Sequence, residues 1–159
     1  MNRNIRLLLV DDEERFLNTL ARRLSLREFE VATVTSGAEA LALAGEREFD
    51  LALVDLKMPG MPGDELLERL REDHPFIEVI ILTGHGSVDS AVNCTRAGSY
   101  GYLQKPCETD ELLEVLRRAY QKRVQRKLKI TEERMERLAR SWGLESPLGI
   151  LRRLRDLEG

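Results

Sequence analysis

The first 110 residues alternate between short apolar runs and segments in which apolar residues recur every three or four positions. Continuous apolar runs favour strands that are buried on both faces of a parallel sheet, and the three-to-four spacing favours amphipathic helices. The apolar runs occupy residues 5–10, 31–35, 51–55, 77–82 and 100–103. The helical segments occupy residues 14–27, 36–47, 65–73 and 87–97, and a fifth opens at 108–110.

Strict alternation of strands and helices with short connections predicts an α/β protein. We expect a flavodoxin-like, doubly wound, five-stranded parallel sheet with strand order 2-1-3-4-5, followed by a C-terminal helical extension. Ser36, Asp64 and Ser87 precede helical segments and are expected to cap them. Gly98 is expected to end the fourth helix.

Composition and charge exclude several classes of protein. The chain has 159 residues, of which 33% are charged and 42% hydrophobic, enough to form a buried core. Residues 1–110 carry 12 basic and 20 acidic side chains, whereas residues 111–159 carry 13 basic and 8 acidic ones. The net charge of −3 for the whole chain argues against a protein that coats nucleic acid without sequence preference. The apolar runs are too short for a membrane span or a signal peptide. The two cysteines fit neither a metal site nor a disulfide framework. We therefore expect a cytoplasmic protein.

Polar residues follow four of the predicted strands. Asp11 and Asp12 follow the first strand, Asp55 ends the third, Thr83 follows the fourth and Lys105 follows the fifth. In open α/β sheets the ligand crevice lies at the carboxyl ends of the strands, where the strand order reverses. Three carboxylates gathered there repel one another, and a divalent cation with oxygen ligands, Mg²⁺ or Mn²⁺, would offset that repulsion. With a lysine and a hydroxyl beside them, they form a set suited to phosphoryl transfer.

Taken singly, each of these residues has a more ordinary interpretation. An aspartate after a strand is most often a helix cap, which would suffice for Asp11 or Asp12. Thr83 alone suits a turn, and Lys105 alone suits an exposed turn before a proline. Their common position at one edge of one predicted sheet favours the chemical interpretation.

Four motifs link these residues to a known family. They are Val10-Asp11-Asp12-Glu13, Leu53-Val54-Asp55-Leu56-Lys57-Met58-Pro59-Gly60, Ile81-Leu82-Thr83-Gly84 and Tyr102-Leu103-Gln104-Lys105-Pro106. In order and spacing they resemble the receiver domain of two-component response regulators over about residues 4–120. The segments around Thr83 and Lys105 look most like receivers of nitrogen-regulator-type transcription factors.

The resemblance implies a phosphorylation and metal site. It implies that Asp55 is the phosphoacceptor and that Mg²⁺, for which Mn²⁺ can substitute, is held by Asp55, by Asp12 directly and by Asp11 through water. The backbone carbonyl of Lys57 matches a further metal ligand. The side chains of Lys57 and His85 match positions that flank the acyl phosphate and tune its hydrolysis, although His85 taken alone is an ordinary solvated loop histidine.

The resemblance also implies a switch. Thr83 matches the hydroxyl that moves toward the phosphoryl group, and Lys105 matches the lysine that pairs with a phosphate oxygen. Tyr102 matches the aromatic switch residue, which turns inward as Thr83 moves. The peptide bond between Lys105 and Pro106 is expected to be cis.

Residues 121–159 carry no recognisable effector domain. The absence of proline and glycine and the spacing of apolar residues predict one long helix, or two helices with a break near residues 130–131, followed by a last helix over residues 148–157. Residues 117–129 contain seven cations and no acid, which suits a nucleic-acid arm or, more simply, a solvated helix face. The apolar stripe favours helix pairing. We therefore expect a receiver domain over residues 1–120 and a coiled-coil or dimerisation segment over residues 121–159.

Three functions remain open at this point. The first is a receiver that takes a phosphoryl group from a sensor histidine kinase and changes the face formed by its fourth helix, fifth strand and fifth helix. It would signal by protein contact or as a homodimer to a target that the sequence does not name, and would catalyse only its own phosphorylation and dephosphorylation. The second is a DNA- or RNA-binding transcriptional regulator, or a fragment of one, that uses the basic helix. The third is a Mg²⁺-dependent phosphatase on a related fold.

Overall fold

The computed structural model describes residues 4–158 and divides into two compact units, Met1–Arg123 and Val124–Gly159. The first unit contains the whole sheet, and the second contains the C-terminal part of a long helix and one further helix. The predicted domain boundary at residue 120 lies close to the division between these units.

The first unit is a five-stranded parallel sheet in the order β2-β1-β3-β4-β5, so the predicted fold class is confirmed. The strands are β1 (Ile5–Val10), β2 (Phe29–Val34), β3 (Leu51–Val54), β4 (Glu78–Thr83) and β5 (Gly101–Gln104). The helices are α1 (Glu14–Ser25), α2 (Gly37–Glu46), α3 (Gly63–Asp73), α4 (Val88–Arg96) and α5 (Thr109–Ser141).

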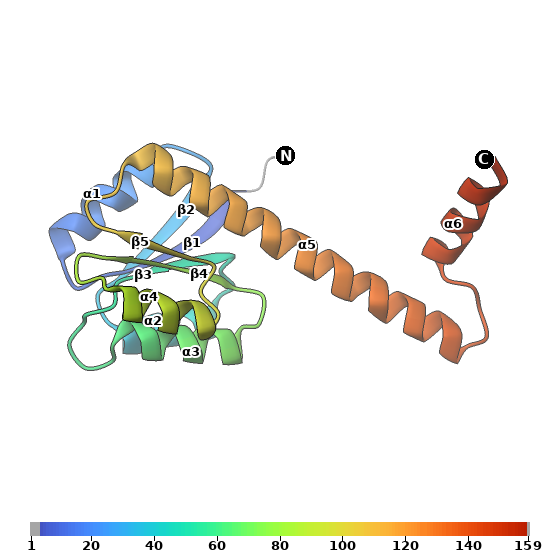
Figure 1. Ribbon diagram of the computed structural model, residues 1–159, viewed down its shortest axis with the longest axis horizontal. Helices are drawn as coiled ribbons and strands as arrows, with labels where there is room; N and C mark the ends of the chain where they lie inside the picture. Colours follow the sequence, from blue (N-terminus) through green and yellow to red (C-terminus); the bar gives the residue numbers. More distant parts are fainter. Residues whose placement is uncertain (1–3, 159) are drawn as a thin grey trace. The chain divides into compact units, whose positions relative to one another are not determined.

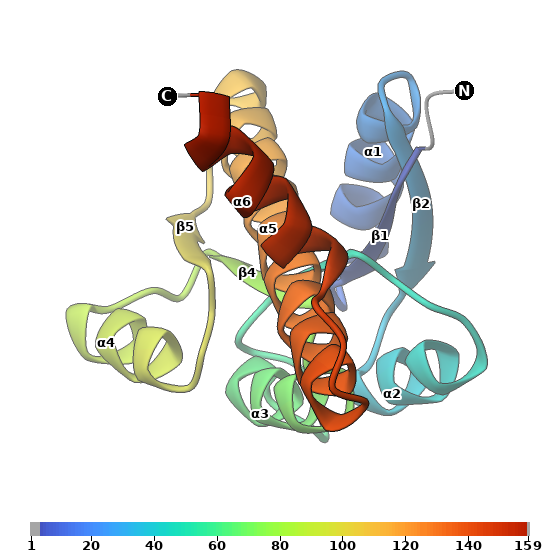
Figure 2. The same ribbon diagram turned by 90° about the vertical axis from the view of Figure 1, so that its right-hand side faces the viewer.

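The three central strands send alternate side chains into two apolar cores, one on each face of the sheet. Helices α1 and α5 cover one face, and α2, α3 and α4 cover the other (Figures 1 and 2). The buried strand residues of the first core are Ile5, Leu7, Leu9, Phe29, Leu51, Leu53, Ile80 and Leu82, and those of the second are Leu8, Val10, Ala52, Val54, Val79 and Ile81. Burial on both faces explains why these strands read as continuous apolar runs. It also holds the carboxyl ends of β1, β3 and β4 in fixed positions.

Two of the three predicted caps are present, and the third is wrong. The Ser36 and Ser87 side chains accept hydrogen bonds from backbone N–H groups in the first turns of α2 and α4. Helix α3 starts earlier than predicted, after Pro62, so Asp64 lies inside its first turn and caps nothing. Pro62 has a φ of −66°, as its ring requires, and the N–H of Gly63 donates to the carbonyl of Leu56 at 2.7 Å. The negative charge of Asp64 still interacts favourably with the positive, N-terminal end of the helix dipole.

A partly buried ionic cluster ties α5 to the end of the sheet opposite Asp55. Arg6 at the start of β1 and Arg123 in α5 both pair with Asp50, at 2.9 Å and 3.1 Å, and Arg123 also pairs with Glu48 at 3.1 Å. Arg123 and Asp50 are 5% and 4% exposed. Because a buried charge is costly without its partner, this cluster fixes α5 against the first unit up to Arg123.

The second unit resolves the alternatives for the tail. Helix α5 runs without a break to Ser141, and Thr131 lies inside it with its hydroxyl donating to the carbonyl of Lys127 at 2.9 Å. Gly143, with a φ of +68°, follows the end of the helix. Helix α6 (Pro147–Glu158) comes next, close to its predicted range of residues 148–157. Within residues 4–158, no helix combines the length and apolar character that crossing a bilayer requires.

Candidate metal and phosphoryl-transfer site

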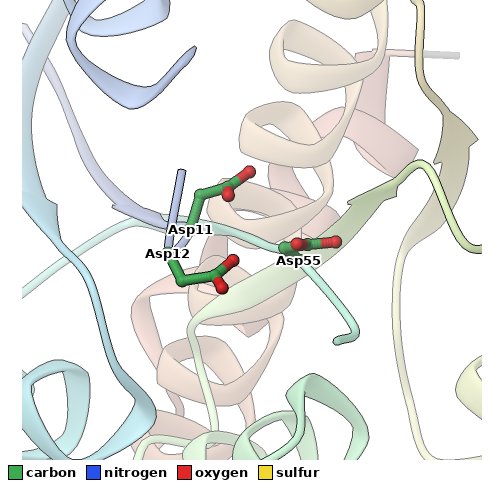
Figure 3. Close-up of side chains that lie close together, drawn as sticks. All are labelled: Asp11, Asp12 and Asp55. Carbon is green, nitrogen blue, oxygen red and sulfur yellow. The ribbon is translucent and has the colours of Figure 1, made fainter. Parts of the chain in front are cut away.

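Three aspartates from two neighbouring strands meet at the carboxyl edge of the sheet (Figure 3). Asp11 and Asp12 follow β1, and Asp55 follows β3. Val10 pairs with Val54 in the parallel register, and the N–H of Asp55 donates to the carbonyl of Val10 at 3.0 Å. One carboxylate oxygen of each aspartate lies within 4.8 Å of the others. The predicted juxtaposition of these three residues is therefore present in the structure.

Asp55 is buried and has one carboxylate oxygen without a hydrogen-bond partner. Its side chain is 3% exposed, and its Oδ1 has no hydrogen-bond partner. Burial raises the pKa of Asp55 above its ordinary value, and the charge of Asp11 adds to the rise. The Thr83 hydroxyl and the Lys105 charge lower that pKa and so partly offset the rise. The buried Asp55 oxygen has no hydrogen-bond donor and lies beside two more carboxylates. Together these carboxylates provide oxygen ligands that fit a hard divalent cation.

Lys105 lies among the same carboxylates, but its closest contact is with Asp11. The Nζ atom is 2.6 Å from an Asp11 oxygen and 3.7 Å from an oxygen of Glu13. It also lies 4.1 Å from the centre of the Phe16 ring, a cation–π contact. Glu13 and Phe16 were not among the predicted site residues, because an acid and an aromatic at the start of a helix suggest only solvation and packing. The peptide bond between Lys105 and Pro106 is cis.

The two hydroxyl-bearing switch candidates have defined hydrogen bonds. Thr83 is fully buried at the end of β4, and its Oγ1 accepts from the N–H of His85 at 3.1 Å. The Tyr102 hydroxyl in β5 lies 2.6 Å from the Ser90 hydroxyl in α4. This bond joins α4 to β5, so a movement of Tyr102 would change their contact. The side chains of His85 and Lys57 are exposed at the same edge of the sheet.

Gly63 supports the backbone of Asp55 and was missed in the sequence. A Cβ at Gly63 would overlap the carbonyl oxygen of Asp55 and come within 2.9 Å of the Leu56 Cα. The start of α3 therefore packs directly on the loop that leaves β3. Because the segment 58–63 contains two prolines and two glycines, it suggested only a loop, and nothing in its pattern singles out Gly63.

Comparisons with known proteins agree with the fold. A family model described as "Response regulator receiver domain" matches residues 7–117. The chain belongs to the response regulator receiver family. This is a family of signalling proteins rather than a class of conventional enzymes, and its members generally bind Mg²⁺ at an acidic pocket.

The receiver is related in sequence to transcriptional regulators. Transcriptional regulatory protein GlrR from Escherichia coli (strain K12) is 39% identical over 110 residues, which cover 69% of this chain and 25% of GlrR. The chain thus spans about a quarter of the length of that relative.

Solved receiver domains have the same architecture. The response regulator receiver domain protein (CheY-like) from Methanospirillum hungatei JF-1 has a TM-score of 0.75 and 32% identity, covering 77% of this chain and 98% of that one. The beryllofluoride-activated NtrC4 receiver domain dimer has a TM-score of 0.71 and 32% identity, covering 74% of this chain and 98% of that one.

The thiol beside the receiver's cis proline is expected to be unreactive. Burial, and then the negative charge of Glu111, raise the pKa of Cys107 to about 11. At pH 8 only about one such thiol in a thousand is ionised, so alkylation by iodoacetamide should be on the order of 100-fold slower than for an unperturbed cysteine. The rate, followed by mass spectrometry, should rise until about pH 11. Glu111→Gln should speed the reaction at pH 8 and Glu114→Gln should not; a native rate equal to that of a free peptide thiol would contradict the assignment.

Proposed function

We propose that this receiver takes a phosphoryl group onto Asp55 from a phosphohistidine of a sensor histidine kinase in the cytoplasm. The observation that carries the proposal is the cluster of Asp11, Asp12 and Asp55, each with a carboxylate oxygen within 4.8 Å of the others, in which the buried Asp55 keeps one oxygen without a hydrogen-bond partner. Thr83 and Lys105 lie at the same edge of the sheet and both act on the pKa of Asp55.

Mg²⁺, or Mn²⁺ in its place, would be held by Asp11, Asp12, Asp55 and the backbone carbonyl of Lys57. When bound, the cation offsets the repulsion among the carboxylates and neutralises charge on the transferred phosphoryl group. The fit of the cation to these residues rests on the clustered carboxylates and on the Asp55 oxygen that lacks a hydrogen-bond donor.

The side chains of the receiver perform the remaining steps. A carboxylate oxygen of Asp55 attacks phosphorus, an O–P bond forms, and the N–P bond of the donor breaks with its electron pair leaving on the imidazole. The product carries about −1.5 to −2 charges, more than the Asp55 carboxylate that it replaces. The Thr83 hydroxyl can then donate to a phosphoryl oxygen, and the Lys105 ammonium can exchange its 2.6 Å contact with Asp11 for one with the phosphoryl group. The exposed side chains of Lys57 and His85 lie where they can control the approach of water to the acyl phosphate.

The signal would leave the site through Tyr102. Movement of Thr83 toward the phosphoryl group frees space beside β5, and Tyr102 can fill that space if its 2.6 Å contact with Ser90 breaks. Because Ser90 belongs to α4, this change alters the face formed by α4, β5 and α5. We infer that this face signals by protein contact, including homodimerisation, for which the NtrC4 receiver dimer is a precedent.

A nucleic-acid function has one observation in its favour, the relationship to transcriptional regulators. The basic stretch of residues 117–129 gives it less support, because three of its cations already pair with acids of the chain. Arg117 pairs with Glu28, Arg118 with Glu114, and Arg123 with Glu48 and Asp50. If residues 117–129 do bind DNA, the affinity should fall steeply as salt rises, and the absence of such binding would remove this alternative.

Acetyl phosphate and Mg²⁺ give a direct test of the proposed function. We expect one phosphoryl group per chain, released by hydroxylamine and mapped to the peptide that contains Asp55, with no labelling when EDTA is present. The phosphatase alternative predicts turnover of small phosphate esters without a stable adduct. An adduct on another residue, or labelling in EDTA, would contradict the assignment.

A further inference from the structure

The part of α5 in the second unit exposes a narrow apolar stripe. Val124, Leu128, Met135, Leu138 and Trp142 are between 42% and 68% exposed. Together with Thr131 they follow one another at steps of four, three, four, three and four residues. At about 100° per residue these six positions lie within about 80° of the helix circumference. A stripe so narrow and regular is the pattern of a coiled-coil seam, whereas helices that pack on a globular core have wider apolar faces.

The other helix of the second unit does not cover this stripe. Helix α6 is held to α5 by an ion pair between Arg152 and Glu136 at 3.3 Å. Glu136 is one residue beyond Met135 and therefore lies about 100° around the helix from it. The exposed fractions above are measured with α6 in place, so the stripe is available to another molecule.

We infer that a second copy of this chain covers the stripe, in a parallel, two-stranded coiled coil in register. The seam is defined as Val124, Leu128, Thr131, Met135, Leu138 and Trp142. Leu128, Met135 and Trp142 take the a positions of the heptad, and Val124, Thr131 and Leu138 take the d positions. The inference goes beyond the proposed function and does not depend on phosphorylation, because none of these residues lies near Asp55 in sequence or belongs to the site.

Charges beside the seam favour the parallel direction. In this register Lys127 is a g residue and Glu132 is the next e residue. A parallel pair places Lys127 of each copy beside Glu132 of the second copy, and the twofold symmetry repeats the attraction. An antiparallel pair would instead bring g residues together, which sets Lys127 opposite Arg134. The polar Thr131 at a central d position weakens the seam, so we expect a dimer that dissociates on dilution.

Sedimentation of the full chain tests the occupant of the seam. The native protein should dimerise reversibly at concentrations below about 1 mM, and Leu128→Glu with Met135→Glu should weaken the dimer at least about 100-fold. Lys129→Glu, which adds the same side chain one position off the seam, should change the affinity less than about threefold. Circular dichroism and labelling of Asp55 by acetyl phosphate check that the variants fold. A native protein that stays monomeric, or a seam variant that dimerises as well as the native one, would overturn the inference.

Cross-linking tests the direction of the two helices. In a chain with Cys94→Ala and Cys107→Ser, Leu128→Cys and Met135→Cys, each as a single change, should both form a disulfide-linked dimer on mild oxidation. Glu133→Cys, on the opposite side of the helix, should not. If linkage occurs only when Leu128→Cys chains are mixed with Leu138→Cys chains, the helices are antiparallel and the inference is wrong.

Reversing the charges of Lys127 and Glu132 tests the register of the two helices. Lys127→Glu should weaken the dimer by between about twofold and about thirtyfold, the range expected for two exposed ion pairs, and Glu132→Lys should act alike. The two changes together should restore the native affinity. If their effects simply add, the copies are not in the inferred register. Performing all three tests on Asp55→Asn as well separates the seam from the proposed phosphorylation, since the seam predicts a dimer in that variant too.

Discussion

Asp55→Asn is expected to abolish phosphorylation and, in metal-free buffer, to stabilise the fold. An asparagine amide is a far weaker nucleophile than the carboxylate it replaces, so labelling by acetyl phosphate should fall at least about 100-fold. The gain in stability has a separate cause. Burial raises the pKa of Asp55, which means that the folded protein disfavours the ionised form of this residue.

The sign of the pH dependence follows from the direction of this shift. A carboxylate with a raised pKa contributes stability that is fully present below its ordinary value of 3.8 and is lost as pH rises through the folded value. The advantage of Asp55→Asn should therefore be absent in acid and should grow toward neutral pH, where we expect about 1–2 kcal/mol, or a rise of about 2–8 °C in Tm. Urea unfolding at several pH values in EDTA measures it.

Asp73→Asn is the matched control, because Asp73 is exposed at the end of α3. It should leave both labelling and stability nearly unchanged. Added Mg²⁺ should stabilise the native protein more than Asp55→Asn and so reduce the difference between them. If Asp55→Asn is less stable than the native chain at neutral pH in EDTA, the electrostatic description of the three aspartates is wrong.

The sequence predicted the fold and the clustering of Asp11, Asp12 and Asp55 because both depend on local patterns. Continuous apolar runs locate β1, β3 and β4, and the polar residue that ends each run lies at the carboxyl edge of the sheet. The positions of Asp11, Asp55 and Thr83 thus follow once the strands and their order are known. The early start of α3 was missed because Pro62 and Gly63 suggest a loop, although proline is also favoured where helices begin.

What the sequence could not predict are contacts between distant segments. The pairing of Lys105 with Asp11, and its position over Phe16, depend on how β5 and α1 pack, which no local pattern encodes. The same holds for Arg123 and Asp50, since the basic stretch around Arg123 suggested a solvated surface and the structure buries that one residue in an ion pair. Thr131 illustrates an ambiguity of pattern, because a threonine followed by acids can begin a helix or continue one.

Gly63→Ala is expected to lower stability by about 3 kcal/mol or more and to slow phosphorylation of Asp55 at least about tenfold. The methyl group of alanine would overlap the carbonyl oxygen of Asp55, and the Leu56 backbone lies on the same side. Neither atom is the end of a flexible side chain, so the start of α3 or the loop after β3 must move. A shift of about 1 Å at a reacting group is enough to cost a large factor in rate.

Gly45→Ala is the control that shows whether the stability lost in Gly63→Ala comes from the contact of Gly63 with the Asp55 backbone. Gly45 lies in α2, and a Cβ there would meet no atom within 4 Å. Alanine is the better helix former, so Gly45→Ala should raise the free energy of unfolding by about 0.5–1 kcal/mol. Gly63 is also helical, and propensity alone predicts the same gain for Gly63→Ala. Opposite signs in urea unfolding would therefore isolate the packing of α3 on the Asp55 backbone. A gain in both variants would mean that the loop after β3 yields without cost, and Asp55 should then be phosphorylated at the native rate.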